Sequence, residues 1–248
     1  MTVEHEGEPR ILLLQARAPD DPILEHELDC FVRRTGLPRA SFRAVNMAEV
    51  DFGPHLLDDV DLVTVGGAGD YSVVQGGFDW HEEMLALIGL VCERGTPMFA
   101  SCFGFQALVQ CFGGELETAP ARAEIGTFTV RLTEEGRRDD FFGQLPEAFD
   151  AQFGHKDSVM RLPSGLTRLA ASDRCPVQAV RVADKPIVAT QFHPELSARD
   201  NIHRYVRYIT NYKGFDETHE EAVARAERIH RESPEANRLL ERFLDRLF

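Results

Sequence analysis

Short apolar runs alternate with amphipathic, helix-length segments through the N-terminal part of the chain. Continuous apolar runs occur at 10–15, 62–65 and 97–100, and a further strand-like run lies at 40–45. Between them, residues 23–32 and 78–92 carry apolar side chains at the spacing of one helical face. A continuous apolar run is typical of a parallel strand that is buried on both faces. The alternation therefore predicts an α/β fold, a doubly wound and mostly parallel sheet with helices on both faces.

The pattern changes in the middle of the chain, where strand-like runs follow one another without long helices between them. These runs lie at 124–132, 148–153, 167–171, 177–182 and 186–192, and a helical segment follows at 198–212. We expect this small strand-rich segment to pack as antiparallel strands or to extend the main sheet. Residues 1–212 are thus predicted to form one domain.

Beyond residue 212 the composition becomes charged and helical, which predicts a C-terminal helical extension over 213–248. Ser233 and Pro234 are typical of a helix start, since serine caps the first turn and proline suits its first position. The last helix has an apolar face that includes Leu240, Phe243 and Leu244. We expect this face to dock on the domain, with a contact between two copies in a homodimer as the alternative.

Composition excludes several classes of function. The net charge is −14, whereas proteins that bind nucleic acids carry a basic face. No stretch approaches the ~18 apolar residues of a membrane span, and residues 1–10 lack the apolar core of a signal peptide. Five scattered cysteines predict a reduced, cytoplasmic setting. The sequence contains neither zinc-type Cys/His spacing nor a phosphate-binding Gly-x-x-x-x-Gly-Lys-Ser/Thr loop, so we expect no metal and no cofactor.

One of the cysteines lies where a strand is expected to turn into a helix. The apolar run 97–100 ends just before Cys102, and a helical segment begins shortly after Gly104. This order is typical of a nucleophile elbow, in which the turn residue projects its side chain into a cleft. Ala100, Ser101 and Gly104 are small enough for such a crowded turn, and the following helix N-terminus favours a thiolate. The alternative is a buried structural cysteine, which is the usual role of this residue.

A candidate base for this cysteine lies at His193-Pro194-Glu195, after the apolar run 186–192. Proline biases the residue before it toward an extended conformation, and in an extended segment residues two apart point to the same side. Glu195 can therefore hold one tautomer of His193 and leave its other ring nitrogen for Cys102. A solvated turn is the alternative for this tripeptide.

The segments around Cys102 and Gln191-Phe192-His193-Pro194-Glu195 resemble those of the class I glutamine amidotransferases, and the resemblance covers roughly residues 10–212. It implies a flavodoxin-like fold and a reaction in which the cysteine attacks the side-chain amide of glutamine, forms a γ-glutamyl thioester and releases ammonia. The implied roles are Cys102 as nucleophile, His193 as general acid and base, and Glu195 as the group that orients His193.

The same resemblance implies an oxyanion hole and a substrate site. Gly67 lies in a loop similar to the family's oxyanion loop, so its N–H and that of Phe103 are the implied donors. Gln106 matches a position that contacts the substrate glutamine, although it is also an ordinary helix residue. The segment 152–159 is similar to a loop that holds the α-amino and α-carboxylate groups, which implies substrate contacts for Phe153, Gly154, His155 and Asp157. A surface turn is the alternative for this segment.

Two departures from the family pattern concern the backbone around the site. Ala100 and Ser101 stand where the family usually has a glycine and an apolar residue. The glycine-rich loop that starts at Gly66 is longer than the common form, which leaves open which N–H faces the oxyanion. Neither departure removes a member of the Cys102, His193 and Glu195 set.

The sequence leaves several functions open. The first is a free-standing glutaminase that serves a separate synthetase or acts alone. The second is a γ-glutamyl hydrolase or peptidase, because the acyl-enzyme step is the same and only the leaving group differs. The third is a catalytically silent scaffold that binds a partner, and a redox protein with an elbow cysteine is a further alternative. The intact triad favours an enzyme.

Overall fold

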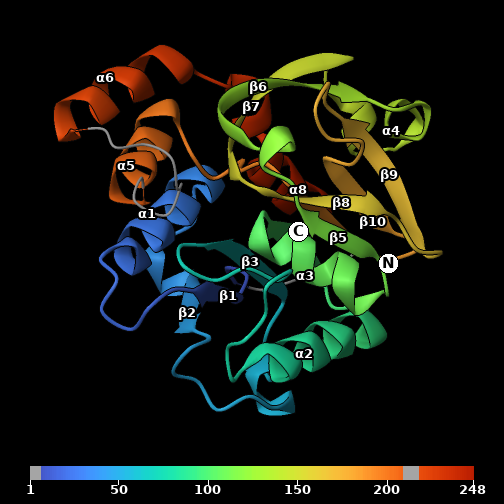
Figure 1. The fold of residues 1–248 in the computed structure, drawn as a ribbon. Helices are drawn as coiled ribbons and strands as arrows, with labels where there is room; N and C mark the ends of the chain where they lie inside the picture. Colours follow the sequence, from blue (N-terminus) through green and yellow to red (C-terminus); the bar gives the residue numbers. More distant parts are fainter. Residues whose placement is uncertain (1–6, 209–217) are drawn as a thin grey trace.

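A nine-stranded mixed sheet with the strand order β2-β1-β3-β4-β11-β10-β9-β6-β7 organises the chain (Figure 1). This computed structural model describes residues 7–208 and 218–248. One half of the sheet is parallel and the other half is antiparallel. The parallel strands are β1 (Ile11–Ala16), β2 (Phe42–Asn46), β3 (Leu62–Ala68), β4 (Met98–Ser101) and β11 (Ile187–Thr190). The antiparallel strands are β10 (Ala179–Val182), β9 (Leu166–Ala171), β6 (Glu124–Leu132) and β7 (Ala148–His155).

Helices cover both faces of the parallel half, as the alternation predicts. The helices of the described part are α1 (Ile23–Thr35), α2 (His81–Arg94), α3 (Phe103–Cys111), α4 (Glu134–Arg138), α5 (Ala198–Tyr208), α6 (His219–Ile229), α7 (Pro234–Asn237) and α8 (Leu239–Leu247). Short 3₁₀ turns lie at Arg39–Ser41, Pro54–Leu57, Pro120–Arg122 and Phe142–Gln144.

The two faces of the sheet contribute to two separate cores. Leu12 and Leu14 of β1 belong to the core that contains α2 and α3, whereas Leu13 belongs to the core that contains α1 and α8. This division follows from the strand geometry, in which successive side chains point to opposite faces. The continuous apolar runs are therefore explained by burial on both sides.

The strand-rich middle extends the main sheet, which is one of the two arrangements that the sequence left open. β11 returns to lie parallel to β4, and β10 then starts the antiparallel half. A second sheet, β5 (Glu115–Thr118) paired with β8 (Asp157–Arg161), was not predicted. Its strand β5 has mostly exposed side chains, so it lacks the apolar run that marks a buried strand.

The apolar face of α8 packs within the chain itself. Phe243 is 2% exposed, and its ring lies 5.5 Å from that of Phe99 in β4 and 5.6 Å from that of Phe141. The division into a 1–212 domain and a 213–248 extension stays a prediction, and residues 209–217 lie outside the described part. Among the described helices, none has the length and apolar character needed to cross a membrane.

Candidate active site

Cys102 occupies a strained turn between β4 and α3. Its φ of 50° and ψ of −99° lie outside the favourable regions for a residue with a side chain. Such strain costs of order 1–3 kcal/mol and is found at functional sites. The backbone amides on both sides hold the turn, since the Cys102 N–H donates to the carbonyl of Thr190 at 2.8 Å and the Gln106 N–H donates to that of Cys102 at 3.0 Å. The structure therefore contains the elbow that the sequence predicts.

Gly104 allows this elbow to lie directly against β3. A Cβ at this position would meet the Cβ of Val65 at 2.7 Å and its carbonyl oxygen at 2.8 Å. Neither contact can be relieved by a flexible side chain, so only glycine fits. This explains why a small residue follows the cysteine at this spacing.

His193 lies opposite the elbow and is oriented by Glu195. Its Nδ1 is 2.7 Å from Oε1 of Glu195, and its ring interacts with the side chain of Cys102. His193 is 5% exposed and Glu195 is fully buried. Burial by itself would lower the pKa of His193, but the charges of Glu195 and Cys102 outweigh burial and raise that pKa to about 9.

The glycine-rich segment after Val65 lies against the ring of His193. A Cβ on Gly67 would lie 2.7 Å from Cε1 of His193, so only a glycine lets the backbone approach this ring. The structure places Gly67 within β3, which extends to Ala68 rather than ending at Val65 as the apolar run suggested. The pairing of Ala16 with Ala68 beyond a register shift explains this extension. Phe103 begins α3, so its N–H belongs to the first turn of the helix.

A row of buried charged residues lies next to the His193–Glu195 pair. Arg204 of α5 stands between two carboxylates, at 3.4 Å from Glu195 and 3.4 Å from Glu27. Arg17 approaches the same Glu27 oxygen at 2.9 Å and donates to the Tyr208 hydroxyl at 2.9 Å. The carboxylate of Glu195 is buried, which opposes its charge, yet His193 and then Arg204 keep its pKa below the ordinary value.

Sequence reasoning missed these charges, although one signal was present. Glu27 stands between Ile23 and Phe31 on the apolar face of α1, and an acid at such a position needs a buried partner. The sequence does not indicate that this partner is Arg204, because 177 positions separate the two residues (204 − 27).

A cavity of about 290 Å³ opens beside Cys102. Its lining includes four of the predicted substrate residues, Gln106, Gly154, His155 and Asp157. The carboxylate of Asp157 accepts a hydrogen bond from Ser72 at 2.6 Å and another from Thr118 at 2.6 Å. Both hydroxyls were missed from the sequence. Ser72 lies in the glycine-rich loop that was assigned to the oxyanion hole, and Thr118 belongs to the unpredicted strand β5.

The remaining predicted substrate residues have other surroundings. Gln106 donates to the backbone carbonyl of Asp157 at 3.3 Å and to the side chain of Gln191 at 3.1 Å. The side chain of Phe153 is fully buried in the core, with its ring 5.9 Å from that of Phe192. Phe153 therefore does not line the cavity beside Cys102, whereas its neighbour Gly154 does.

A second group of chemically active side chains lies beneath the cavity. Nδ1 of His155 is 2.9 Å from the carbonyl of Asp157, and Nε2 is 3.1 Å from Glu124. Cys175 belongs to the same buried group, and burial raises the pKa of its thiol to about 11. A thiol with a raised pKa is mostly protonated at neutral pH, which favours Cys102 over Cys175 as the nucleophile.

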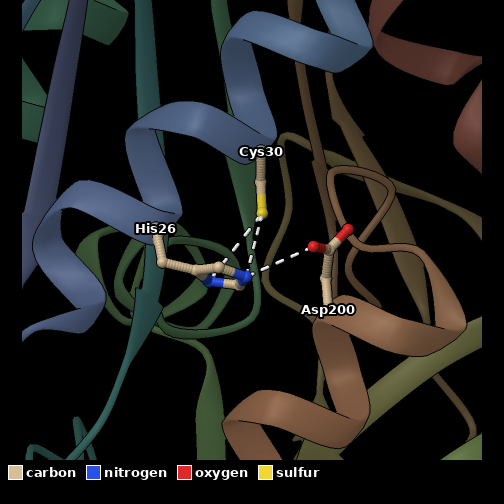
Figure 2. A group of neighbouring side chains, drawn as sticks. All are labelled: His26, Cys30 and Asp200. Atoms are coloured by element: carbon tan, nitrogen blue, oxygen red, sulfur yellow. Dashed lines mark hydrogen bonds and ion pairs between the residues drawn. The ribbon is translucent and has the colours of Figure 1, made fainter.

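Among the described residues, two groups contain side chains that could ligate a metal ion. One is the Glu124–His155–Cys175 group, and the other lies between α1 and α5 (Figure 2). Nε2 of His26 lies 3.8 Å from Sγ of Cys30 and 3.2 Å from Oδ1 of Asp200. Arg33 donates to that sulfur at 3.2 Å and to the same carboxylate oxygen at 2.8 Å. A guanidinium already supplies the positive charge that a metal would bring, so we interpret the cluster as a polar contact between the two helices.

Comparison with known proteins points to one family. The model of the family described as "Glutamine amidotransferase class-I" matches residues 48–210. A glutamine-hydrolysing GMP synthase subunit of Methanocaldococcus jannaschii is 33% identical over 125 residues, which are 50% of this chain and 64% of that protein. A glutamine-hydrolysing GMP synthase of Thermosipho africanus is 36% identical over 107 residues, covering 43% of this chain and 20% of the relative. The match thus spans less than two thirds of the length of either relative.

Solved structures extend the similarity of fold to almost the whole chain. A glutamine amidotransferase from Thermotoga maritima superposes with a TM-score of 0.73 at 21% identity and covers 97% of this chain and 99% of its own. A glutamine amidotransferase from Methylobacillus flagellatus gives a TM-score of 0.68 at 19% identity and covers 98% of this chain and 96% of its own. Because the family model spans well over half of the sequence, the chain belongs to the class I glutamine amidotransferase family.

Proposed function

We propose that this protein is a glutaminase that hydrolyses the side-chain amide of glutamine to glutamate and ammonia. The observation that carries the proposal is the strained Cys102 elbow, which faces the His193–Glu195 pair and opens into one cavity. A reactive cysteine, an oriented base and a pocket with a buried carboxylate are the parts that acyl transfer from an amide needs.

The reaction proceeds in two balanced steps. The Cys102 thiolate attacks the amide carbon, the C–N bond breaks, and His193 donates a proton so that ammonia leaves. Water then loses a proton to His193 and attacks the thioester carbon, which releases glutamate and restores the thiolate. The N–H groups of Gly67 and Phe103 stabilise the oxyanion in both steps, and one such donor contributes about 3 kcal/mol.

The cavity selects a substrate that carries an ammonium group. Asp157 is 5% exposed, and Ser72 and Thr118 fix both of its carboxylate oxygens. A carboxylate held in this way is preorganised for the α-ammonium of an amino acid.

The variant Asp157→Asn should therefore bind glutamine more weakly. The isosteric amide keeps the shape of the side chain but removes the charge, so KM should rise about 10- to 100-fold while kcat changes much less. Steady-state kinetics with glutamine measures this split. A fall in kcat at unchanged KM would assign Asp157 to the chemistry instead of binding.

The relatives suggest where the ammonia goes. Several are described as one subunit of a glutamine-hydrolysing GMP synthase, and we propose that a separate synthetase protein receives the ammonia from this chain. The alternative leaving group is an amine or peptide, which would make the protein a γ-glutamyl hydrolase.

One assay separates these possibilities. Purified protein is incubated with glutamine and, separately, with γ-glutamyl dipeptides, and release of glutamate and ammonia is followed. Ammonia from glutamine supports the glutaminase, while turnover of the dipeptides alone supports the hydrolase. If turnover of glutamine begins only when a synthetase is added, the result supports a separate synthetase as the partner that receives the ammonia. If no turnover occurs in any condition, the result supports a silent scaffold.

A further inference from the structure

Asn237, at the end of α7, lies against the loop that carries the catalytic base. Its side-chain Nδ2 donates to the carbonyl of Pro194 at 2.9 Å and to the carbonyl of Leu196 at 2.7 Å. The side chain is 7% exposed, and the two carbonyls flank Glu195. Both amide hydrogens are thus in use, and the reversed amide would point its oxygen at two carbonyl oxygens.

The rest of this loop is held from within the sheet. The N–H of His193 donates to the carbonyl of Gln152 in β7 at 2.9 Å, and the Thr190 hydroxyl donates to the carbonyl of Phe192 at 2.8 Å. Asn237 adds two further hydrogen bonds to this loop. The backbone on both sides of Glu195 therefore depends on a residue from the C-terminal part of the chain.

The segment that leads to Asn237 is anchored to the same strand. Nε2 of Gln152 donates to the carbonyl of Arg231 at 2.7 Å and to the hydroxyl of Ser233 at 3.0 Å. Arg231 also forms an ion pair with Asp150 at 2.7 Å. Gln152 thus binds His193 through its backbone and residues 231–233 through its side chain, which ties the two segments together.

We propose that residues 231–237 form a C-terminal clamp in which Asn237 is a positioning residue for the Glu195–His193 pair. The clamp lies beyond the segment 48–210 that the family model matches. Removal of Asn237 leaves two buried carbonyls without donors and lets the loop shift. Small misplacements of catalytic groups are costly, because the reactive geometry tolerates only fractions of an ångström.

The clamp is tested with Asn237→Ala and with the isosteric Asn237→Asp, which keeps the shape but loses the amide donors. In both variants kcat for glutamine should fall about 10- to 100-fold, with KM within about 3-fold of the wild-type value. Leu240→Ala is the matched control, since Leu240 is a buried core residue of α8 without a role in the loop. It should lower the melting temperature and leave kcat unchanged well below that temperature.

A second readout follows the catalytic pair without turnover. Cys102 is alkylated with iodoacetamide across a pH series, and modification of its peptide is measured by mass spectrometry. Glu195 and Cys102 face His193 and hold its pKa near 9 against burial. The upper inflection of the alkylation profile marks deprotonation of His193. It should lie near pH 9 in the wild type and lower in Asn237→Ala, which adds no charge beside the pair. Unchanged kcat in both variants, together with an unchanged inflection in Asn237→Ala, would overturn the clamp.

The kinetic part of this inference rests on the proposed function, whereas the alkylation part does not. If the wild type hydrolyses no γ-glutamyl compound but the inflection moves in Asn237→Ala, the clamp holds and the glutaminase proposal fails. If the wild type hydrolyses glutamine and the variants match it in both readouts, the glutaminase proposal holds and the clamp fails.

Discussion

Replacement of Cys102 by alanine should abolish the hydrolysis of glutamine, with a loss in kcat of at least about 10⁴-fold. In the proposed mechanism the Cys102 thiolate forms the covalent intermediate, and alanine offers no atom that can do so. The fold should persist, because the N–H of residue 102 still reaches Thr190 and the substitution removes only one sulfur atom. Circular dichroism and thermal unfolding verify the fold, while ammonia release measures the activity.

Two other cysteines provide controls of different kinds. Cys92→Ala removes a buried thiol of α2, outside the lining of the cavity, and should retain activity within about 2-fold. Cys175→Ala removes the thiol of the Glu124–His155–Cys175 group and tests whether that group supplies the nucleophile. Loss of the reaction in Cys175→Ala together with an active Cys102→Ala would move the catalytic centre to that group.

The variant Glu195→Gln should lower kcat about 10²- to 10⁴-fold, because the neutral amide no longer selects one tautomer of His193. Its second effect is on pH dependence. The His193 pKa of about 9 exceeds the ordinary value only because nearby negative charge outweighs burial. Removal of the Glu195 charge lets burial lower that pKa. As pH rises, activity that requires protonated His193 should therefore be lost at a lower pH in the variant than in the wild type.

The measurement is kcat/KM for glutamine from about pH 6 to 10, which reports the pKa values of the free enzyme. The wild type should lose activity near pH 9, and the variant should lose it earlier. Glu124→Gln is the matched comparison, since Glu124 also pairs with a histidine while buried. Glu124→Gln should alter KM through His155, whereas the loss of kcat/KM near pH 9 should stay where it is in the wild type. An unchanged position of this loss in Glu195→Gln would contradict the assigned role of Glu195.

The parallel strands β1, β3 and β4 were predictable because they are buried on both faces, whereas the edge strand β2 is partly exposed. The run 62–65 shows the limit of this signal, since β3 continues through Gly66 and Gly67, which carry no apolar side chain. The order of the strands in the antiparallel half of the sheet was not predictable, because it depends on which strands pair and not on the composition of each strand. The exposed strand β5 carries no hydrophobic periodicity at all.

The arrangement of the proposed catalytic residues was predictable to different degrees. Cys102 and the His193–Glu195 pair follow from short local patterns, in which proline, glycine and spacing set the backbone. The contact of the Gly67 backbone with His193 required the fold, since 126 positions separate the two residues (193 − 67). The predicted role of Phe153 as a substrate contact has no support from its buried position.

The sequence by itself determined which residues are the candidates for reaction, because an elbow cysteine and a His-Pro-Glu tripeptide are local arrangements. Only the tertiary structure decided what holds them in place. Arg204 beside Glu195, the hydroxyls of Ser72 and Thr118 on Asp157, and the amide of Asn237 are contacts between distant segments. A polar side chain becomes such a partner only when packing removes water from around it, and no local pattern in the chain specifies that burial.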